Sequence, residues 1–577
     1  MLRHYFRTVS ALFQHYFSTS QVLFRSCFRR IAATARAAIN GHFDGYLNNY
    51  KNHHGDNSML AMSQLINRLS QTDPNMIATS NGDRVQTWRE FNSKVARFAG
   101  GLQKLGVSDD TSVAILALNS DRYLEFMFAV PWAGGVFQPV NTRLAGPEIV
   151  YWLNDSAAKV LILDTSFAPL VASIRSELAH IEHFVFIDEG SCPEGCLSYD
   201  DLVAADPVPD AGRSGDDVAG LFYTGGTTGR SKGVMLTHNN LVINAMQAAP
   251  LMNSLPGDRI LHVAPMFHIA DAIVCMTSVV MSGSNYFQPG FDPVATMEGI
   301  AQHNIERMIL VPTMINMFVN HPSIRNYDLS SLRVVLYGAS PMPEAVIKKA
   351  MEELPQARFY QAYGQTEAAP CITILSAERH TFEGPLAGKI KSAGQAVPGV
   401  DLAIVDDDNN PVETGIVGEV CMRGANVMKG YRNMPEQTAK TIVDGWLHTG
   451  DGGYIDEDGF LFIVDRVKDM IISGGENVYS AEVENALYQH PAINQCAVIG
   501  VPDEKWGEQV HAVVVPHEGQ KVTEDEVIAH CKALIAGFKC PRSVSFQSEP
   551  LPLSGAGKIL KTELRKPFWP QGERSVN

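Results

Sequence analysis

Long apolar runs and clustered cysteines are both missing from this chain of 577 residues. The longest apolar run, 126–137, is too short to cross a bilayer, and it contains Pro131 and two glycines. The nine cysteines follow no repeated spacing, and the nearest pair, Cys192 and Cys196, has no His or Cys cluster beside it. We therefore expect no membrane-spanning helix, no cysteine metal site, and reduced thiols that suit the cytoplasm.

Net positive charge is missing as well. The formal net charge is -16 at pH 7, and the body of the chain contains no basic stripe. Nucleic-acid backbones select basic protein surfaces, so we expect no nucleic-acid partner. The chain is too long for a single ordinary hydrophobic core, so we expect two or more domains. The sequence does not decide between a monomer and a homodimer.

The N-terminal extension, residues 1–58, differs in composition from the rest. Residues 1–43 contain six arginines and no Asp or Glu, which is typical of a mitochondrial transit peptide. Two other interpretations stay open. The segment is a helix in peripheral contact with a membrane surface, or it is upstream sequence that is never translated, because Met59 and Met62 directly precede the first globular segment.

From about Leu65 onward, apolar strand-like runs alternate with amphipathic helical runs. This alternation predicts a parallel sheet with helices on both faces. The first strands are expected at 113–118, 160–163 and 184–187, with a helix at 169–178.

Three further predicted strands, 261–264, 308–311 and 334–337, run directly into polar or turn-forming segments. Ligands of open α/β sheets bind outside the carboxyl ends of the strands. We therefore expect the exit segments to converge on one cleft. These segments are 265–268, 312–314, 338–341 and, after Phe359 and Tyr360, 361–367.

After about Val400, short β runs and turns predict a small antiparallel or barrel-like subdomain. A charged stretch, 465–469, then precedes a final segment with its own helices and strands. We predict a large domain of layered α/β sheets with a β subdomain over 59–467, and a smaller mobile α+β domain over 468–577.

A glycine-rich loop at 223–233, Tyr-Thr-Gly-Gly-Thr-Thr-Gly-Arg-Ser-Lys-Gly, follows the strand-like pair Leu221 and Phe222. Glycines let the backbone bend inward, threonines add hydroxyl donors, and the two basic residues add positive charge. This combination predicts phosphate binding, although an ordinary surface loop is the alternative. The loop is not a P-loop of the Walker A type, because Gly233 follows Lys232 where Ser or Thr is needed.

The loop resembles the signature Tyr-Thr-Ser-Gly-Thr-Thr-Gly-x-Pro-Lys-Gly of the AMP-forming acyl-CoA synthetases. Gly225 replaces the Ser and Ser231 replaces the Pro, which removes one hydroxyl donor and one rigid position. The resemblance runs from about Met62 to Arg565, through separated motifs in the family's order. It implies that a carboxylic acid reacts with ATP to give an acyl-adenylate and pyrophosphate, that coenzyme A then displaces AMP, and that Mg²⁺ is the cofactor.

The resemblance also implies residue roles. Nucleotide-binding positions are Thr224, Gly225, Gly226, Thr227, Thr228, Gly229 and Lys232 in the loop, Gly338, Ala339 and Ser340 against the adenine, Tyr363, Gly364 and Thr366, Asp451 at the ribose, and Arg466. The catalytic positions are Lys558, Glu367 as the Mg²⁺ ligand, and His268 beside the acyl carboxylate. Lys468 matches the hinge, and Gly474 and Gly475 match the strip that contacts coenzyme A.

Each of these residues also has a plain structural interpretation. Glu367 could be a carboxylate at a helix N-terminus, Asp451 a turn residue, and Arg466 part of a solvated charge run. A histidine at a strand end is commonly a satisfied structural residue, and Lys558 could belong to a basic tail.

The predicted reaction is ATP-dependent ligation of a medium- or long-chain fatty acid to coenzyme A. Met314, Met317 and the segment 269–270 are candidates for the acyl pocket. Alternatives are an aryl or other hydrophobic acid, loading of a carrier protein in place of coenzyme A, and a non-catalytic nucleotide or acyl binder.

Overall fold

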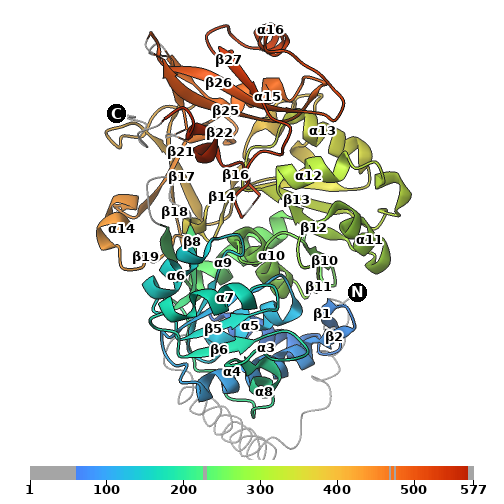
Figure 1. Ribbon diagram of the computed structural model, residues 1–577, viewed down its shortest axis with the longest axis vertical. Coiled ribbons are helices and arrows are strands. Elements are labelled where there is room, and N and C mark those ends of the chain that lie inside the picture. Colours follow the sequence, from blue (N-terminus) through green and yellow to red (C-terminus); the bar gives the residue numbers. More distant parts are fainter. Residues whose placement is uncertain are drawn as a thin grey trace, which may run out of the picture. The chain divides into compact units, whose positions relative to one another are not determined.

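The computed structural model describes residues 60–224, 231–466, 469–473, 476–503, 505–555 and 557–569 (Figure 1). The extension 1–58 and the positions 468, 474 and 475 therefore lie outside the described residues, as does the side chain of Arg466. Among the described helices, none is long and apolar enough to cross a membrane. The eight cysteines in these ranges are free thiols, as predicted.

Two large sheets form the first part of the chain. The nine-stranded sheet is parallel from β14 to β1 and antiparallel at its edges. Its strands, in spatial order, are β16 (Gln395–Ala396), β15 (Cys371–Leu375), β14 (Arg358–Gly364), β13 (Val334–Gly338), β12 (Arg307–Leu310), β10 (Arg259–His262), β11 (Ser284–Phe287), β1 (Ile77–Asn81) and β2 (Arg84–Thr87).

The eight-stranded sheet is parallel from β8 to β7, and β9 and β19 complete it in antiparallel pairs. Its spatial order is β19 (Gly430–Tyr431), β9 (Lys232–Thr237), β8 (Val218–Thr224), β4 (Val136–Pro139), β3 (Ser112–Leu116), β5 (Val160–Leu163), β6 (His183–Phe186) and β7 (Leu197–Ser198). The predicted strands 160–163 and 184–187 are thus present as β5 and β6, and 113–118 is present as the shorter β3.

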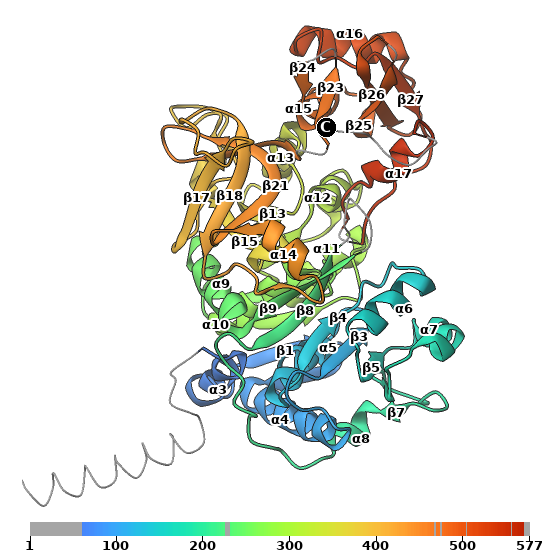
Figure 2. The ribbon, with the colours of Figure 1, turned by 90° about the vertical axis from the view of Figure 1, so that its left-hand side faces the viewer.

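Helices fill the space between the two sheets and cover their outer faces (Figure 2). The inner layer contains α3 (Met62–Thr72), α4 (Trp88–Lys104), α5 (Asp121–Trp132), α9 (His238–Leu251) and α10 (Ile269–Val280). Two of these helices contact both sheets: α5 contacts β4 and β11, and α9 contacts β9 and β15. The outer helices are α11 (Pro293–His303), α12 (Pro312–Val319) and α13 (Glu344–Glu353) on one sheet, and α6 (Gly146–Asp155) and α7 (Ala168–Ile174) on the other.

Strand β3 shows why the sheet is covered on both faces. Successive side chains of a strand point to opposite faces, so Val113 and Ile115 pack in the inner cluster while Ala114 and Leu116 pack under α6 and α7. All four are buried. A continuous apolar run therefore reads as a strand buried on both sides.

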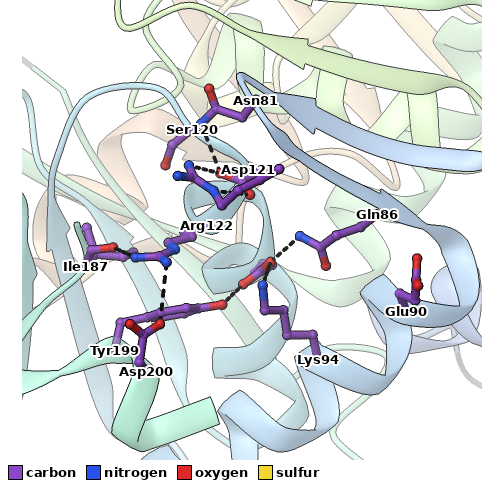
Figure 3. A network of polar contacts seen from close by, with 12 residues as sticks. Asn81, Gln86, Glu90, Lys94, Ser120, Asp121, Arg122, Ile187, Tyr199 and Asp200 are labelled. Atoms are coloured by element: carbon purple, nitrogen blue, oxygen red, sulfur yellow. Dashed lines mark hydrogen bonds and ion pairs between the residues drawn. The ribbon is translucent and has the colours of Figure 1, made fainter. Parts of the chain in front are cut away.

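Two buried carboxylates anchor α5 to its neighbours (Figure 3). Asp121 accepts hydrogen bonds from Arg84 Nε at 3.0 Å and Nη2 at 2.6 Å. Glu125 accepts from Gln86 Nε2 at 2.7 Å and from the hydroxyl of Tyr199, which lies in α8 (Tyr199–Val203). The apolar run at 126–137 thus covers the end of helix α5, which contains Pro131, and the start of β4.

The second part of the chain is built from two smaller antiparallel-rich sheets. The subdomain sheet contains β17 (Val400–Val405), β18 (Gly418–Gly424), β21 (Trp446–Ile455), β20 (Ile442–Val443) and β22 (Leu461–Arg466), beside α14 (Pro435–Thr441). The C-terminal sheet contains β24 (Glu476–Val478), β23 (Ile471–Ser473), β26 (Gly507–Pro516), β25 (Ile493–Asp503) and β27 (Ser543–Phe546), with α15 (Ser480–Leu487), α16 (Glu524–Leu534) and α17 (Lys561–Arg565). The predicted fold class is confirmed.

Candidate active site

The glycine-rich loop starts and ends on two paired strands. β8 and β9 are antiparallel, and Thr224 lies directly opposite Lys232 in their register. The loop positions 225–229 lie outside the described residues, so their phosphate contacts stay a prediction. The strand pair nevertheless fixes where the loop begins and ends, at the carboxyl end of β8.

A tyrosine links the loop lysine to the predicted metal ligand. The ammonium of Lys232 lies 4.8 Å from the ring centroid of Tyr431, and the Tyr431 hydroxyl donates to Glu367 Oε1 at 2.8 Å. Glu367 is 9% exposed. Burial and the neighbouring carboxylate raise the pKa of Tyr431, so its hydroxyl stays protonated and donates. One carboxylate oxygen of Glu367 is therefore held in place by a tyrosine that also contacts the loop lysine.

The turn predicted to line the adenine requires a glycine at its start. A Cβ on Gly338 would lie 2.1 Å from the carbonyl oxygen of Ala362 in the paired strand β14. The next residue, Ala339, has φ +68°, and Ser340 is half-buried. The backbone thus leaves the sheet through a conformation that L residues rarely adopt, at the carboxyl end of β13.

Tyr363 and Asp451 meet across two sheets. The Tyr363 hydroxyl donates to Asp451 Oδ2 at 2.8 Å, which joins β14 to the subdomain strand β21. Arg466 lies opposite Asp451 in the backbone register of β21 and β22. The three positions predicted to hold the nucleoside therefore come from three neighbouring strands.

The turn that carries Asp451 is itself held by a carboxylate. Glu419 accepts from the backbone N–H of Gly450 at 2.9 Å and contacts His448 Nδ1 at 2.9 Å. Gly450 has φ +72°, and the backbone N–H of Asp451 donates to Thr449 Oγ1 at 3.1 Å. These bonds orient Asp451 before any ligand arrives.

His268 begins helix α10 as its N-cap residue. Its Nδ1 accepts from the backbone N–H of Ala270 at 3.2 Å. Burial, and then the nearby charge of Lys558, lowers the pKa of His268 to about 3. The imidazole is therefore neutral at ordinary pH.

Lys558 stands on a short loop that closes on itself. Leu553 and Ile559 form a β-bridge, and the backbone N–H of Ser554 donates to the carbonyl of Lys558 at 2.7 Å. The carbonyl of Gly557 accepts from Thr313 Oγ1 at 2.9 Å. The loop therefore lies against the exit segment of β12.

Two family models match this chain. An AMP-binding enzyme model covers residues 67–432, and an AMP-binding enzyme C-terminal domain model covers residues 482–558. The chain belongs to the AMP-binding enzyme family. The predicted family and its class, AMP-forming acid–thiol ligase, are confirmed.

Several relatives align with this AMP-binding enzyme over nearly their whole length. A feruloyl-CoA synthase from Amycolatopsis sp is 41% identical over 87% of this chain and 98% of its own. An indoleacetate–CoA ligase from Aromatoleum aromaticum is 36% identical, covering 88% and 98%. The long-chain-fatty-acid–CoA ligase FadD13 from Mycobacterium tuberculosis is 34% identical, covering 84% and 93%.

A solved structure shows the same fold. The crystal structure of the anthranilate CoA ligase AuaEII in complex with anthranoyl-AMP has a TM-score of 0.82 and 28% identity to this chain. The match covers 88% of this chain and 97% of that one.

In this AMP-binding enzyme the structure links some of the predicted side chains in pairs. Tyr431 contacts both the loop lysine and Glu367, and the Tyr363 hydroxyl donates to Asp451. The exit segments that follow β13 and β14 adjoin, because Gly338 pairs with Ala362. One expectation is corrected: β14 extends to Gly364, so the predicted polar run 361–367 begins on a strand. Its side chains alternate faces and still place Tyr363 toward Asp451.

The predicted acyl pocket is wrong in part. Met317 is 46% exposed on the outer surface of α12, and it cannot line an enclosed acyl pocket. Met314 is buried, but it belongs to the cluster beneath α12. Ile269 and Ala270 pack in two different clusters of the inner layer.

Sequence reasoning missed Tyr431 and Glu419. Each acts from a distance along the chain: Tyr431 bonds to the predicted residue Glu367, 64 residues away, and Glu419 bonds to Gly450, which is 31 residues away and precedes the predicted Asp451. The short strand β19, which carries Tyr431 onto β9, is only two residues long. A Gly-Tyr pair of this length gives no periodic signal.

Proposed function

We propose that this protein activates an aromatic or other hydrophobic monocarboxylic acid as its adenylate and transfers the acyl group to coenzyme A. The observation that carries the proposal is the contact of the Lys558 loop with the β12 exit, where Thr313 Oγ1 donates to the carbonyl of Gly557 at 2.9 Å. The Glu367–Tyr431 and Asp451–Tyr363 hydrogen bonds, in and directly after β14, support it. The arrangement provides cations for anionic oxygens and an oriented carboxylate for the ribose.

In the first half-reaction, a carboxylate oxygen of the acid attacks the α-phosphorus of ATP, and the bond to pyrophosphate breaks. Both reactants are anionic, so the step needs fixed cations. The ammonium of Lys558 would bind the α-phosphate and carboxylate oxygens. The neutral imidazole of His268 adds no competing charge, because its pKa is about 3.

Glu367 fits the role of a magnesium ligand. Mg²⁺ prefers oxygen ligands and is commonly held by one or two carboxylates together with substrate phosphates. Tyr431 bonds to Oε1 of Glu367, so Oε2 is the oxygen proposed for the metal. When bound, Mg²⁺ would neutralise charge that develops on the pyrophosphate.

In the second half-reaction, the thiol of coenzyme A attacks the acyl carbonyl, the bond to the AMP phosphate breaks, and AMP leaves. We propose that the C-terminal domain rotates near Lys468 between the steps, and that Gly474 and Gly475 then line the path of the pantetheine arm. These positions lie outside the described residues, so the family motifs support this part.

For the acid itself, the 41% and 36% identical relatives are named for ferulate and indoleacetate, and the structural neighbour for anthranilate. This favours an aryl acid over the fatty acid that the sequence first suggested. A fatty acid is the second candidate, because a long-chain ligase is 34% identical. A panel of both acid classes, scored by AMP release that depends on coenzyme A, decides between them. Acyl transfer to a carrier protein without coenzyme A would instead support the loading alternative.

Lys558→Ala tests the mechanism. We expect adenylate formation, measured as exchange of labelled pyrophosphate into ATP, to fall by roughly 100-fold or more, because one transition-state cation is lost. Thioester formation from supplied acyl-adenylate should stay largely intact. Lys566→Ala is the matched control, since Lys566 is an exposed lysine of the same tail that pairs with Glu563 at 2.6 Å. Equal loss of both half-reactions would contradict the assignment.

A further inference from the structure

The two glycines of the Lys558 loop pack closely against the N-terminal domain. Gly555 and Gly557 are both buried. A Cβ on Gly555 would lie 2.4 Å from Asn141 Oδ1, and a Cβ on Gly557 would lie 2.9 Å from Val311 Cγ2. The close approach leaves room for backbone only, so the fit depends on the two glycines.

Two side chains of the N-terminal domain bind the loop backbone. Arg143 Nη1 donates to the carbonyl of Ser554 at 3.1 Å, and Thr313 Oγ1 donates to the carbonyl of Gly557 at 2.9 Å. The bonded carbonyls are three residues apart, and the second precedes Lys558 directly. The pair therefore fixes the backbone from which the Lys558 side chain extends.

The two donors belong to different sheets. Arg143 follows β4 of the eight-stranded sheet, and Thr313 follows β12 of the nine-stranded sheet. Both stand at carboxyl ends of parallel strands, where the substrates of such sheets bind. The loop thus bridges the two halves of the N-terminal domain.

The loop is stiff behind its tip. Leu553 pairs with Ile559, and the backbone N–H of Lys558 donates to Ser554 Oγ at 3.1 Å. Just after the loop, Lys561 pairs with Glu484 of α15 at 2.7 Å. Because these bonds hold the loop to the rest of the C-terminal domain, a hydrogen bond to the tip of the loop positions the whole domain and not only a flexible segment.

We propose that two positioning residues, Arg143 and Thr313, hold the Lys558 loop in place for adenylate formation and have no part in thioester formation. We call this pair of residues the clasp. The inference rests on the proposed two-step function. A ligand or bond that favours one arrangement of a domain shifts the population toward it. Loss of the clasp should therefore reduce the fraction of molecules in which the Lys558 loop is docked on the N-terminal domain.

The test uses the full chain and measures the two half-reactions separately. Arg143→Ala and Thr313→Val should each slow pyrophosphate exchange about 5- to 10-fold, and the double variant roughly 30-fold or more, as expected for one lost hydrogen bond each. Thioester formation from supplied acyl-adenylate should change by less than about twofold, because the clasp is absent from that step. Thr313→Ser keeps the hydroxyl that Thr313→Val removes, so this variant should exchange pyrophosphate at close to the wild-type rate.

Matched controls lose the same kind of bond elsewhere. Arg175 Nη2 donates to the carbonyl of Gly195 at 2.9 Å, and Thr381 Oγ1 donates to the carbonyl of Glu383 at 3.0 Å, both on exposed surface. Arg175→Ala and Thr381→Val should leave both half-reactions unchanged.

The outcomes separate this inference from the proposed function. If the wild type exchanges no pyrophosphate with any acid, the proposed function fails and the clasp fails with it. If the wild type is active and Lys558→Ala is inactive in exchange, the function stands. In that case unchanged exchange in the double variant, or an equal fall in both half-reactions, overturns the clasp, whereas a selective fall in exchange supports it.

Discussion

The hydrogen bond between Tyr363 and Asp451 gives a quantitative prediction for ATP binding. The Tyr363 hydroxyl lies 2.8 Å from Asp451 Oδ2, and both side chains are half-buried. A hydrogen bond to a charged acceptor contributes about 1.5–3 kcal/mol, and partial exposure favours the lower end. Tyr363→Phe should therefore raise KM for ATP by roughly tenfold, while the aromatic ring stays.

A double-mutant cycle isolates this bond. If Tyr363 acts by orienting Asp451, then Asp451→Ala should remove most of the effect of Tyr363→Phe. The coupling energy, from kcat/KM for ATP in the pyrophosphate-exchange assay, should be about 1.5 kcal/mol. Additivity of the two changes within about 0.5 kcal/mol would refute the reasoning.

The nucleotide offers a second check. Asp451 is proposed to bind the ribose hydroxyls, so Tyr363→Phe should change the kinetics with 2′,3′-dideoxy-ATP by less than about twofold. Tyr454→Phe is the control, because Tyr454 lies in the same strand as Asp451 and stacks on Phe462 with ring centroids 4.9 Å apart. It should change neither nucleotide's kinetics.

Two further predictions concern pH and magnesium. Burial lowers the pKa values of three histidines to about 4, 3 and 4; these are His238, His268 and His380. Each imidazole is neutral in the folded protein but becomes protonated on unfolding when the pH is below its usual pKa. The free energy of unfolding is therefore highest above about pH 6.5 and falls toward pH 4, by up to about 1.4 kcal/mol per pH unit for each group. Urea unfolding at pH 7, 6 and 5 measures this, and a midpoint independent of pH would contradict it. Tyr431→Phe removes the donor to Glu367 Oε1 and should raise the Mg²⁺ concentration for half-maximal exchange by about 3- to 10-fold; an unchanged magnesium titration would remove Tyr431 from the site.

Much of the sheet architecture could be predicted because it depends on local patterns. Val160 to Leu163 is an uninterrupted apolar run, and it is strand β5 with the same bounds. Leu221 and Phe222 likewise lie inside β8, directly before the phosphate loop. Apolar runs bounded by turns carry this information without any knowledge of tertiary contacts.

What could not be predicted depends on contacts between distant parts of the chain. Arg143 and Ser554 are 411 residues apart, and no local pattern relates them. The prediction that Met317 lines the acyl pocket failed for a different reason. In α12 the buried residues Met314, Ile315 and Phe318 share one face, and a helix of 3.6 residues per turn directs Met317 away from it. Apolar composition alone does not show which residues of a helix lie on its buried face.

The pKa of His268 connects the electrostatics of the site to the proposed movement of the C-terminal loop. Part of its depression comes from the charge of Lys558, after the larger effect of burial. Coupling between two sites is reciprocal, so withdrawal of the loop should raise the pKa of His268, and protonation of His268 should weaken docking of the loop. The neutral imidazole thus favours the arrangement in which Lys558 attracts two anions. If the C-terminal domain rotates as proposed, the loop would carry its cation away at the point in the cycle where pyrophosphate has gone and the charge it had to offset is smaller.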